Sequence, residues 1–452
     1  MSYFKKVLIA NRGEIARRII RTCKRLGIQT VAVYSEADAM APFVEEADEA
    51  VCLGPAQAKK SYLDIEKVIE AAKQTGADGV HPGYGFLSEN ADFARYLEQE
   101  GITFIGPDAK VIELMGSKIE SRLQMKQVGV PVVPGWDSSL DSVDQALELA
   151  EQIGYPLMLK ASAGGGGIGM TLVHNPGELK NAYATTKQRA ESAFGNGALF
   201  LEKFISNPRH IEVQVAGDHQ GNVIHLFERE CSVQRRNQKV VEESPSPFLD
   251  EETRQRLLET ALRGVKQIGY TTVGTMEFIF DDQKNFYFLE MNTRLQVEHP
   301  VTEGITGIDL VELQLRLAAK QPLSFKQEEV KKTGHSIECR LYAEDPKTFF
   351  PSPGTVTRLI LPTEVRLDFA IKEGNKVTPF YDPMIGKIIV HAATRKEAIE
   401  KMNHALEQVQ VEGIVTNKTL LQMIVKHANF KQGDYTTRFL DQLLNDQHLI
   451  NR

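Results

Sequence analysis

The segment from residue 275 to residue 298 constrains the fold of this chain more than any other. Residues 275–280 and 286–291 are rich in apolar, β-prone side chains, and the polar stretch between them predicts a hairpin turn. With the turn at the middle of that stretch, Glu277 lies opposite Glu290. Opposed residues have Cβ atoms about 5 Å apart, and two negative charges at that distance repel by ~3 kcal/mol at an effective dielectric of about 20. Either one carboxylate is protonated or a cation lies between them, and oxygen ligands favour Mg²⁺ or Mn²⁺.

The chain then continues with a period of two. Polar residues alternate with apolar or small ones, and in an extended chain all the polar side chains point to one face. These residues are Glu290, Asn292, Arg294, Gln296 and Glu298. A solvated strand shows the same alternation, but this row begins at the paired glutamates and mixes both charge signs with amides. We therefore favour an active-site face.

Four consecutive glycines, residues 164–167, follow a strand-like segment that ends at Lys160. Glycine lets the backbone approach a polyphosphate and offers unobstructed N–H donors. The loop is not a Walker A motif, because Met170 stands where the lysine belongs, and β-prone residues follow it instead of a helix. A merely flexible loop is the alternative. Lys160 at its base favours a flap that closes over phosphates.

The first ~110 residues alternate strand and helix patterns, which predicts an open parallel sheet. Residues 11–14, in its first turn, lack the pattern G-x-G-x-x-G, so a nicotinamide site is excluded there. The chain has 452 residues, which is too long for one hydrophobic core, and this length predicts about three domains. The polar stretch 320–334 is typical of a linker. After it, strands are expected at 338–342, 356–360, 365–370 and 387–391, and helices at 396–409 and 417–428.

Composition narrows the class of protein. The net charge of -7 argues against a nucleic-acid binder. The 4 cysteines form no C-x-x-C pair, so neither a zinc ribbon nor a redox site is indicated, and their scarcity fits a reducing compartment. No apolar run approaches the ~18 residues of a membrane span. We expect a cytoplasmic protein that binds neither nucleic acid nor membrane.

Two further segments remain ambiguous. Residues 234–239 form a basic patch, and as a strand they place Arg235, Asn237 and Lys239 on one face, which suits an anion as well as solvent. Arg340 lies on an alternating segment and is either a substrate-binding cation or a surface residue. Cys231 and Cys339 have no neighbouring base in sequence and are interpreted as structural.

Several motifs together resemble biotin carboxylase, over residues 3–445. They are Asn11-Arg12-Gly13-Glu14-Ile15-Ala16, His81-Pro82-Gly83-Tyr84-Gly85-Phe86-Leu87-Ser88-Glu89-Asn90, Lys160 with its glycine flap, and Glu290-Met291-Asn292-Thr293-Arg294-Leu295-Gln296-Val297-Glu298-His299-Pro300. The resemblance implies an α/β fold with a Rossmann-like N-terminal domain (1–114), an ATP-grasp domain (115–330, flap about 131–203) and a β-rich C-terminal domain (331–446).

The resemblance also implies roles for individual residues. The ATP phosphates would be held by Lys118, Lys160, Gly166 and Gly167, and the adenine region would be lined by Glu202, Lys203, Phe204, Ile205, His210 and Asn237. The metal would be held by Glu277, Glu290 and Asn292. Bicarbonate would be held by Lys239, Arg294, Gln296 and Val297, with Glu298 as its base. Biotin would be held by Tyr84 and Arg340, the latter stabilising its enolate form, and Arg366 resembles a dimer-contact residue.

The implied reaction is the MgATP-dependent carboxylation of biotin with bicarbonate through carboxyphosphate, giving carboxybiotin, ADP and phosphate. The chain contains no Ala-Met-Lys-Met motif, so biotin is expected on a separate carrier protein. The resemblance further implies a homodimer and a carboxyltransferase partner within an acyl-CoA carboxylase, with acetyl-CoA and fatty acid biosynthesis as the expected setting. Another ATP-grasp ligase and a nucleotide-sensing paralogue without turnover are the alternatives.

Some positions depart from the family pattern. Ile168 stands where the flap usually has arginine, and Asn237 stands where many members have histidine. Both changes put nucleotide affinity in question while leaving the expected catalytic residues in place. Residues 381–387 are more similar to subunits of other acyl-CoA carboxylases than to the version common in acetyl-CoA carboxylase.

Overall fold

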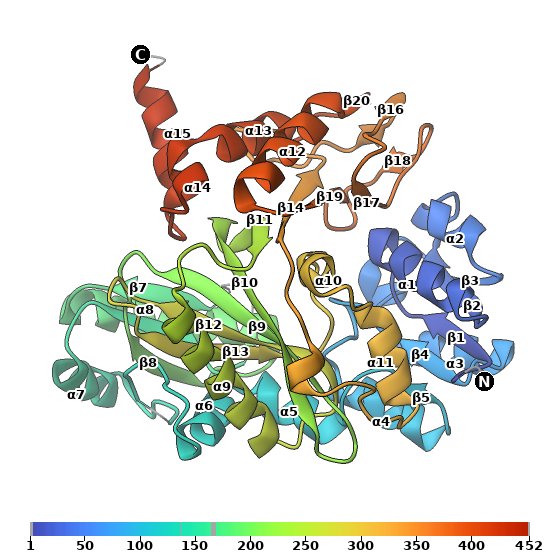
Figure 1. Ribbon diagram of the computed structural model, residues 1–452. Helices are drawn as coiled ribbons and strands as arrows, with labels where there is room; N and C mark the ends of the chain where they lie inside the picture. Colours follow the sequence, from blue (N-terminus) through green and yellow to red (C-terminus); the bar gives the residue numbers. More distant parts are fainter. Residues whose placement is uncertain (1–2, 137, 164–168, 451–452) are drawn as a thin grey trace.

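The computed structural model describes residues 3–136, 138–163 and 169–450, with side chains as far as residue 445. Figure 1 shows the N-terminal strands and helices on the right, the strands of the central part at lower left and the C-terminal helices at the top. Strands and helices alternate along most of the chain. The expected α/β architecture is confirmed.

The N-terminal sheet is parallel, with the strand order β3-β2-β1-β4-β5. Its strands are β1 (Lys6–Ile9), β2 (Gln29–Ser35), β3 (Glu49–Gly54), β4 (Gly79–His81) and β5 (Thr103–Phe104). The helices and 3-10 turns are α1 (Gly13–Arg25), η1 (Glu36–Asp38), α2 (Pro42–Glu46), η2 (Ala58–Lys60), α3 (Ile65–Thr75) and α4 (Ala91–Gln99). The predicted open sheet is therefore confirmed. The chain leaves β1 and β4 in opposite directions, and ligands of such sheets bind at this reversal.

An eight-stranded sheet has the order β13-β12-β9-β10-β11-β14-β19-β17. Its strands are β9 (Arg209–Gly217), β10 (Val223–Arg235), β11 (Gln238–Ser244), β12 (Thr272–Phe280), β13 (Phe286–Asn292), β14 (His335–Tyr342), β17 (Arg366–Phe369) and β19 (Met384–Ala392). Five of these strands precede the polar stretch 320–334 and three follow it. The stretch contains a 3-10 turn, η3 (Gln327–Glu329), and the sheet continues from one side of it to the other through the β11–β14 pair.

Helices fix this sheet through apolar contacts. They are α5 (Ala109–Gly116), α6 (Lys118–Gln127), α9 (Glu251–Gln267), α10 (His299–Thr306) and α11 (Leu310–Ala318). Leu257, Leu258 and Val265 of α9 share a buried cluster with Met276 and Phe278 of β12. Burying one such side chain stabilises the fold by ~1.5–3 kcal/mol. The packing holds β12, and with it Glu277, in a fixed position.

A smaller antiparallel sheet, β7-β6-β8, lies beside the central sheet (Figure 1). It comprises β6 (Leu157–Ala161), β7 (Met170–Val173) and β8 (Leu199–Lys203), with helices α7 (Val143–Ile153) and α8 (Pro176–Phe194). The glycine segment thus connects two antiparallel strands, as predicted, although residues 164–168 lie outside the described residues. Gly169, with φ +74°, follows them, and a Cβ there would lie 2.9 Å from that of Ala161. Only glycine fits this position without a shift.

The remaining elements pack on the far end of the large sheet. They are β15 (Gly354–Thr355), β16 (Arg358–Ile360), β18 (Lys376–Val377), β20 (Gln410–Glu412), α12 (Arg395–Gln408), α13 (Lys418–Lys426), α14 (Ala428–Gln432) and α15 (Phe439–Ile450). The prediction of a single strand at 356–360 is wrong. Buried Val356 separates β15 from β16, which pair with different strands, β18 and β20.

None of the helices in the described ranges is long and apolar enough to cross a bilayer.

Candidate active site

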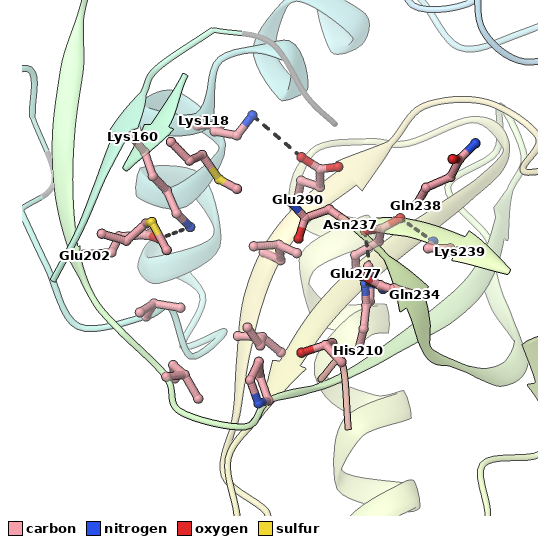
Figure 2. A pocket seen from close by; sticks show the side chains of 18 of the residues that line it. Lys118, Lys160, Glu202, His210, Gln234, Asn237, Gln238, Lys239, Glu277 and Glu290 are labelled. Atoms are coloured by element: carbon pink, nitrogen blue, oxygen red, sulfur yellow. Dashed lines mark hydrogen bonds and ion pairs between the residues drawn. The ribbon is translucent and has the colours of Figure 1, made fainter. Parts of the chain in front are cut away.

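Two cavities meet between the N-terminal region and the large sheet. The first encloses about 640 Å³ and the second about 530 Å³. Residues that line both are Gln238, Arg294, Val297 and Arg340. Figure 2 shows Lys118 and Lys160 on one side of the first cavity, with Glu277, Glu290 and Lys239 on the other. The residues predicted for ATP, metal, bicarbonate and biotin therefore surround two connected spaces, apart from those that lie outside the described residues.

Lys239 lies at the centre of a buried charge cluster. Its Nζ is 2.6 Å from Glu212, 3.0 Å from Glu277 and 2.6 Å from Glu298. Burial opposes the positive charge, but the three carboxylates raise the pKa of Lys239 well above its usual range. The ammonium is fully charged at neutral pH. One cation thus links the hairpin that was predicted to bind metal with the proposed base.

Glu298 is held between two cations. Its Oε1 accepts from Lys239 Nζ at 2.6 Å and its Oε2 from Arg340 Nη2 at 2.9 Å. Burial would raise the pKa of this carboxyl, but Lys239, Arg340 and then Arg229 lower it well below its usual range. Glu298 is therefore ionised and can accept a proton. The carboxylate also joins the two cavities, because Lys239 faces the first and Arg340 lines both.

The predicted pairing of Glu277 with Glu290 between β12 and β13 is confirmed, although the turn centres on Gln283 and a register shift between Phe278 and Glu277 brings the two glutamates opposite each other. Burial and then the charge of Glu277 raise the pKa of Glu290. Lys118 Nζ lies 3.7 Å from Glu290, and Asn292 Nδ2 donates to Glu277 at 2.7 Å. Asn292 lines the same cavity, and its side-chain oxygen accepts from Arg294 at 2.9 Å. Two opposed carboxylates and an amide oxygen are a donor set that suits a hard divalent cation.

The polar row after the hairpin leaves the sheet earlier than expected. β13 ends at Asn292, and residues 293–298 form bends and turns before α10. Their side chains still converge on the site. Gln296 Nε2 donates to Glu277 at 2.7 Å, and Arg294 bonds to Glu89 at 2.8 Å. The prediction that these side chains lie together was right, but the prediction that a continuous strand carries them was wrong.

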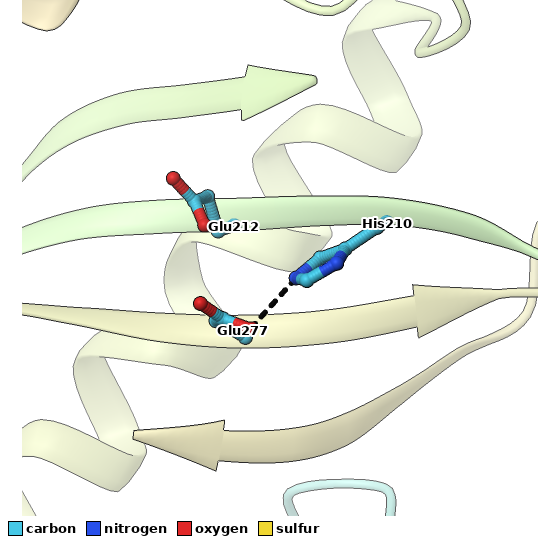
Figure 3. Close-up of side chains that lie close together, drawn as sticks. All are labelled: His210, Glu212 and Glu277. Carbon is cyan, nitrogen blue, oxygen red and sulfur yellow. Dashed lines mark ion pairs between the residues drawn. The ribbon is translucent and has the colours of Figure 1, made fainter. Parts of the chain in front are cut away.

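His210 and Glu212 of β9 lie beside Glu277 of β12 (Figure 3), with ligand atoms within 4.8 Å of one another. His210 Nε2 is 2.7 Å from Glu277. Burial lowers the pKa of His210, but the charge of Glu277 outweighs this effect and raises it. Lys239 already bonds to both carboxylates, and Arg229 bonds to Glu212 at 2.6 Å. Because cations already balance the charges around them, we assign His210 and Glu212 to the positioning of Glu277 and Lys239 and not to metal binding.

The opposite wall of the first cavity comes from the small sheet. Lys160 and Arg122 both form ion pairs with buried Glu202. The Glu202 carboxylate is therefore committed to two cations, while Lys203, Phe204 and Ile205 after it continue the lining. Met158 and Leu172 add apolar side chains to this wall, and Leu289 of β13 adds one from the facing wall, which suits a flat aromatic base.

The basic patch is a hairpin turn and not the expected strand. Arg236 and Asn237 have φ values of 48° and 67° and connect β10 to β11, so Lys239 pairs with Gln234. Arg235 points elsewhere, to Glu344 at 2.9 Å. The left-handed turn explains Asn237, because asparagine tolerates such a conformation better than most residues. Asn237 still lines the first cavity.

The second cavity is bounded by the loops that follow β1 and β4, including Asn11 and Tyr84. Asn11 Nδ2 donates to the Tyr84 carbonyl at 2.7 Å, and the Tyr84 hydroxyl donates to Glu14. Tyr84 therefore stands opposite Arg340 in a space that opens at the strand-order reversal of the N-terminal sheet. Val297 also lines this cavity.

Some predictions are not addressed by this geometry. Gly166, Gly167 and Ile168 lie outside the described residues. Cys231 and Cys339 are buried, and burial raises the pKa of both thiols well above the usual range, which fits their structural interpretation.

Residues that the sequence analysis did not assign complete the site. Glu212 and Arg229 fix Lys239 and Gln296, Glu89 fixes Arg294, and Glu242 lies 2.6 Å from Arg340. The alternation of His210, Glu212 and Gln214 with apolar neighbours resembles the row after the hairpin and was a usable signal. Glu242 offered none, because it lies in the pair Glu242-Glu243 between Val241 and Ser244, where polar and apolar residues do not alternate.

Three sequence-family models cover most of the chain. "Biotin carboxylase, N-terminal domain" matches residues 3–112, "Carbamoyl-phosphate synthase L chain, ATP binding domain" matches 117–326, and "Biotin carboxylase C-terminal domain" matches 338–442. The chain is 59% identical over 443 residues to biotin carboxylase 2 of Bacillus subtilis, covering 98% of this chain and 100% of the relative. It is 57% identical over 439 residues to the biotin carboxylase of Halalkalibacterium halodurans, covering 97% of each.

Solved structures agree. The biotin carboxylase–β,γ-ATP complex of Campylobacter jejuni is 48% identical with a TM-score of 0.95, covering 97% of this chain and 99% of that one. The biotin carboxylase domain dimer of Hydrogenobacter thermophilus 2-oxoglutarate carboxylase, in complex with MgADP, ADP and bicarbonate, is 50% identical with a TM-score of 0.94, covering 98% of each. The whole chain, with its two connected cavities, belongs to the biotin carboxylase family.

Proposed function

We propose that this chain carboxylates biotin on a separate carrier protein, using bicarbonate and MgATP, by means of the residues described above. One observation supports this more than any other. Glu298 lines the first cavity, and its carboxylate bonds to Lys239, which lines that cavity, and to Arg340, which lines both. A single base thus lies between a space suited to ATP and bicarbonate and a space suited to a third substrate.

The first cavity fits ATP. Lys118 and Lys160 approach it from one side and supply positive charge for the phosphates, while residues 203–205 and their apolar neighbours receive the adenine. The Glu202 carboxylate would hold Lys160 in place before ATP binds. The proposed roles of Gly166 and Gly167 rest on the family resemblance.

A divalent cation would fit between Glu277, Glu290 and Asn292. The pairing that places the two carboxylates opposite each other and the raised pKa of Glu290 support this assignment. Bound Mg²⁺ or Mn²⁺ would neutralise charge that develops on the transferred phosphoryl group. In this structure Asn292 donates to Glu277 and its oxygen accepts from Arg294 at 2.9 Å, so a cation would replace Arg294 as the partner of that oxygen.

Bicarbonate would bind beside Lys239, Arg294, Gln296 and the backbone at Val297. Glu298 then takes the O–H proton of bicarbonate, and the freed oxygen attacks the γ-phosphorus of ATP. ADP leaves and carboxyphosphate remains. Lys239 and Arg294 offset the charge on the bicarbonate oxygens in a buried site, where such contacts are strongest.

Carboxyphosphate releases CO₂ and phosphate, and the phosphate accepts the proton of the biotin ureido nitrogen. That nitrogen then attacks CO₂ and forms carboxybiotin. Arg340 would stabilise the negative charge on the ureido oxygen, and Tyr84 would bound the opposite side of the biotin. Exclusion of water from the cavity protects the labile intermediate.

The wider assembly follows the same reasoning. We propose a homodimer, because one relative of this chain is a dimer, with Arg366 at the contact, and a cytoplasmic location. We also propose a carboxyltransferase partner that passes the carboxyl group to an acyl-CoA, with acetyl-CoA as the first candidate.

The test is ADP formation from MgATP and bicarbonate, with and without free biotin. Stimulation by biotin supports the proposal. Stimulation by ammonia or an amino acid instead would favour another ATP-grasp ligase, and tight ATP binding without turnover would favour a nucleotide sensor. Glu407→Gln, an exposed carboxylate on α12, is the matched control for carboxylate substitutions in the site.

A further inference from the structure

Two glutamates lie side by side beneath the reaction centre. Glu242 of β11 and Glu338 of β14 are directly paired in the antiparallel register, and both side chains are fully buried. Directly opposed residues have Cβ atoms about 5 Å apart. The reaction outlined above uses neither carboxylate.

Their charged neighbours are few. Arg340 of β14 has its Nη2 2.6 Å from Glu242 Oε1 and 2.9 Å from Glu298 Oε2. Lys387 of β19 faces the pair but donates to the Val297 carbonyl at 2.7 Å and lies 3.3 Å from Glu14. Among the described residues, Lys239 of β11, which bonds to Glu298 among others, also acts on the pair, and the titratable side chains of Tyr84, Tyr342 and Cys339 lie near it.

Within the described part of the chain, none of the carboxylate oxygens of Glu242 and Glu338 has a hydrogen-bond partner. The two residues differ in their ion pairs: Glu242 pairs with Arg340, whereas Glu338 has no ion pair among the described residues. An ionised carboxylate without donors in a buried site is strongly disfavoured, whereas a neutral acid is tolerated. Burial, and then the charge of Glu242 against the opposing effect of Lys387, raise the pKa of Glu338 well above its usual range.

Glu242 behaves differently because it has a partner. Burial raises the pKa of Glu242 to about 7, although Arg340 acts in the opposite direction. Two neighbouring carboxylates that interact this strongly titrate as a pair. Near neutral pH the pair holds a single negative charge, placed on the side of Arg340.

We propose that Glu242 and Glu338 share one proton and act as a positioning pair that keeps Arg340 divided between Glu242 and the catalytic base Glu298. This inference rests on the proposed function of Arg340 and Glu298. When Glu298 accepts the bicarbonate proton, Arg340 loses one of its two anionic partners. Glu242 then retains the guanidinium at the wall of the second cavity, where the charge on biotin develops.

The protonation of Glu338 limits that attraction. A second negative charge beside Glu242 would draw Arg340 away from the cavity and compete with biotin for its positive charge. Activity that depends on biotin should therefore fall as rising pH removes the shared proton. The carboxyls have raised pKa values, so this loss lies on the alkaline side.

The decisive comparison is between Glu338→Gln and Glu242→Gln. Glutamine at 338 replaces a neutral acid by a neutral amide, so kcat with biotin should match the wild type at neutral pH and the alkaline loss should disappear. Glutamine at 242 removes the charge that holds Arg340 and should lower kcat by about 100-fold, the effect of misplacing a reacting group by ~1 Å. Equal impairment of the two folded variants at neutral pH would overturn the proposal.

Infrared spectroscopy reads the proton without turnover. The wild type at neutral pH should show a carboxylic-acid C=O band that is lost in Glu338→Gln and that titrates away at high pH. An unchanged band in that variant would refute the pair, and the wild-type titration decides the matter even if Glu242→Gln does not fold. Absence of biotin-dependent turnover in the wild type would instead refute the proposed function and leave the infrared result to stand by itself.

Discussion

Replacement of Glu298 by glutamine tests the assignment of the base. The amide has the shape of the carboxylate but cannot accept the bicarbonate proton. Positioned general bases contribute about 10²–10⁴-fold to rate, so the barrier should rise by about 3–5 kcal/mol at ~1.4 kcal/mol per tenfold change. Removing one partner of a buried ion pair can cost about 3–5 kcal/mol of stability when it strands a charge.

Here the stranded cations keep other partners. Lys239 retains Glu212 and Glu277, and Arg340 retains Glu242. We therefore expect a loss of stability nearer the ~1–3 kcal/mol of a single altered buried contact. The variant should fold, and it should bind ATP as tightly as the wild type because Glu298 contacts neither Lys118 nor Lys160 among the interactions described.

The assay is biotin-dependent ADP formation, with ATP affinity measured by calorimetry and folding by thermal unfolding. Glu407→Gln controls for the loss of a carboxylate on the surface. Full activity in folded Glu298→Gln would remove this residue from the mechanism. Loss of ATP binding together with activity would show that the charge cluster, and not proton transfer, is what the substitution disturbs.

Three other predictions address metal, phosphate and stability. Glu290→Gln should weaken Mg²⁺ binding and raise the metal concentration needed for turnover, and chelation with EDTA should stop turnover in the wild type. Lys160→Met should raise KM for ATP by about 10- to 100-fold, the effect of a charge-assisted hydrogen bond, without unfolding, since Glu202 retains its ion pair with Arg122. Glu243→Gln should destabilise the fold by ~3 kcal/mol at neutral pH, because His335 and Arg395, against the effect of burial, lower the pKa of Glu243 to about 2. A lowered carboxyl pKa stabilises the fold above the unfolded value of 4.5 and loses that effect as pH falls toward 2, so the difference in Tm from the wild type should shrink over that interval.

The hairpin was predictable because its information is local. Apolar runs on both sides of a polar turn predicted the two strands, and the pairing of Glu277 with Glu290 was right although it depends on a register shift that the sequence did not reveal. The parallel N-terminal sheet followed from the same kind of local periodicity. At Val356 the chain passes from one small sheet to another, so the periodicity wrongly predicted a single strand there.

The centre of the site was not predictable from spacing. Lys239 of β11 bonds to Glu212 of β9 and to Glu298 just before α10, residues that are distant from it in sequence, and only the resemblance to a family had placed it near bicarbonate. The turn at Asn237 shows the opposite failure. Alternation suggested a continuous strand, but two left-handed residues reversed the chain and sent Arg235 away from the cavity.

The charges of the site also explain how it can remain intact without substrates. Lys160 pairs with Glu202, Arg294 with Glu89, and Lys118 lies near Glu290. The cations proposed to bind anions are thus already satisfied by carboxylates, so ATP and bicarbonate must exchange partners instead of meeting bare charges. Affinity is then a difference between two sets of ion pairs, and only the surplus appears as binding. Substitution of the carboxylate Glu89 should therefore strengthen the binding of bicarbonate by Arg294 but make the position of Arg294 less precise. KM and kcat would then change separately, which mere loss of a structural contact would not produce.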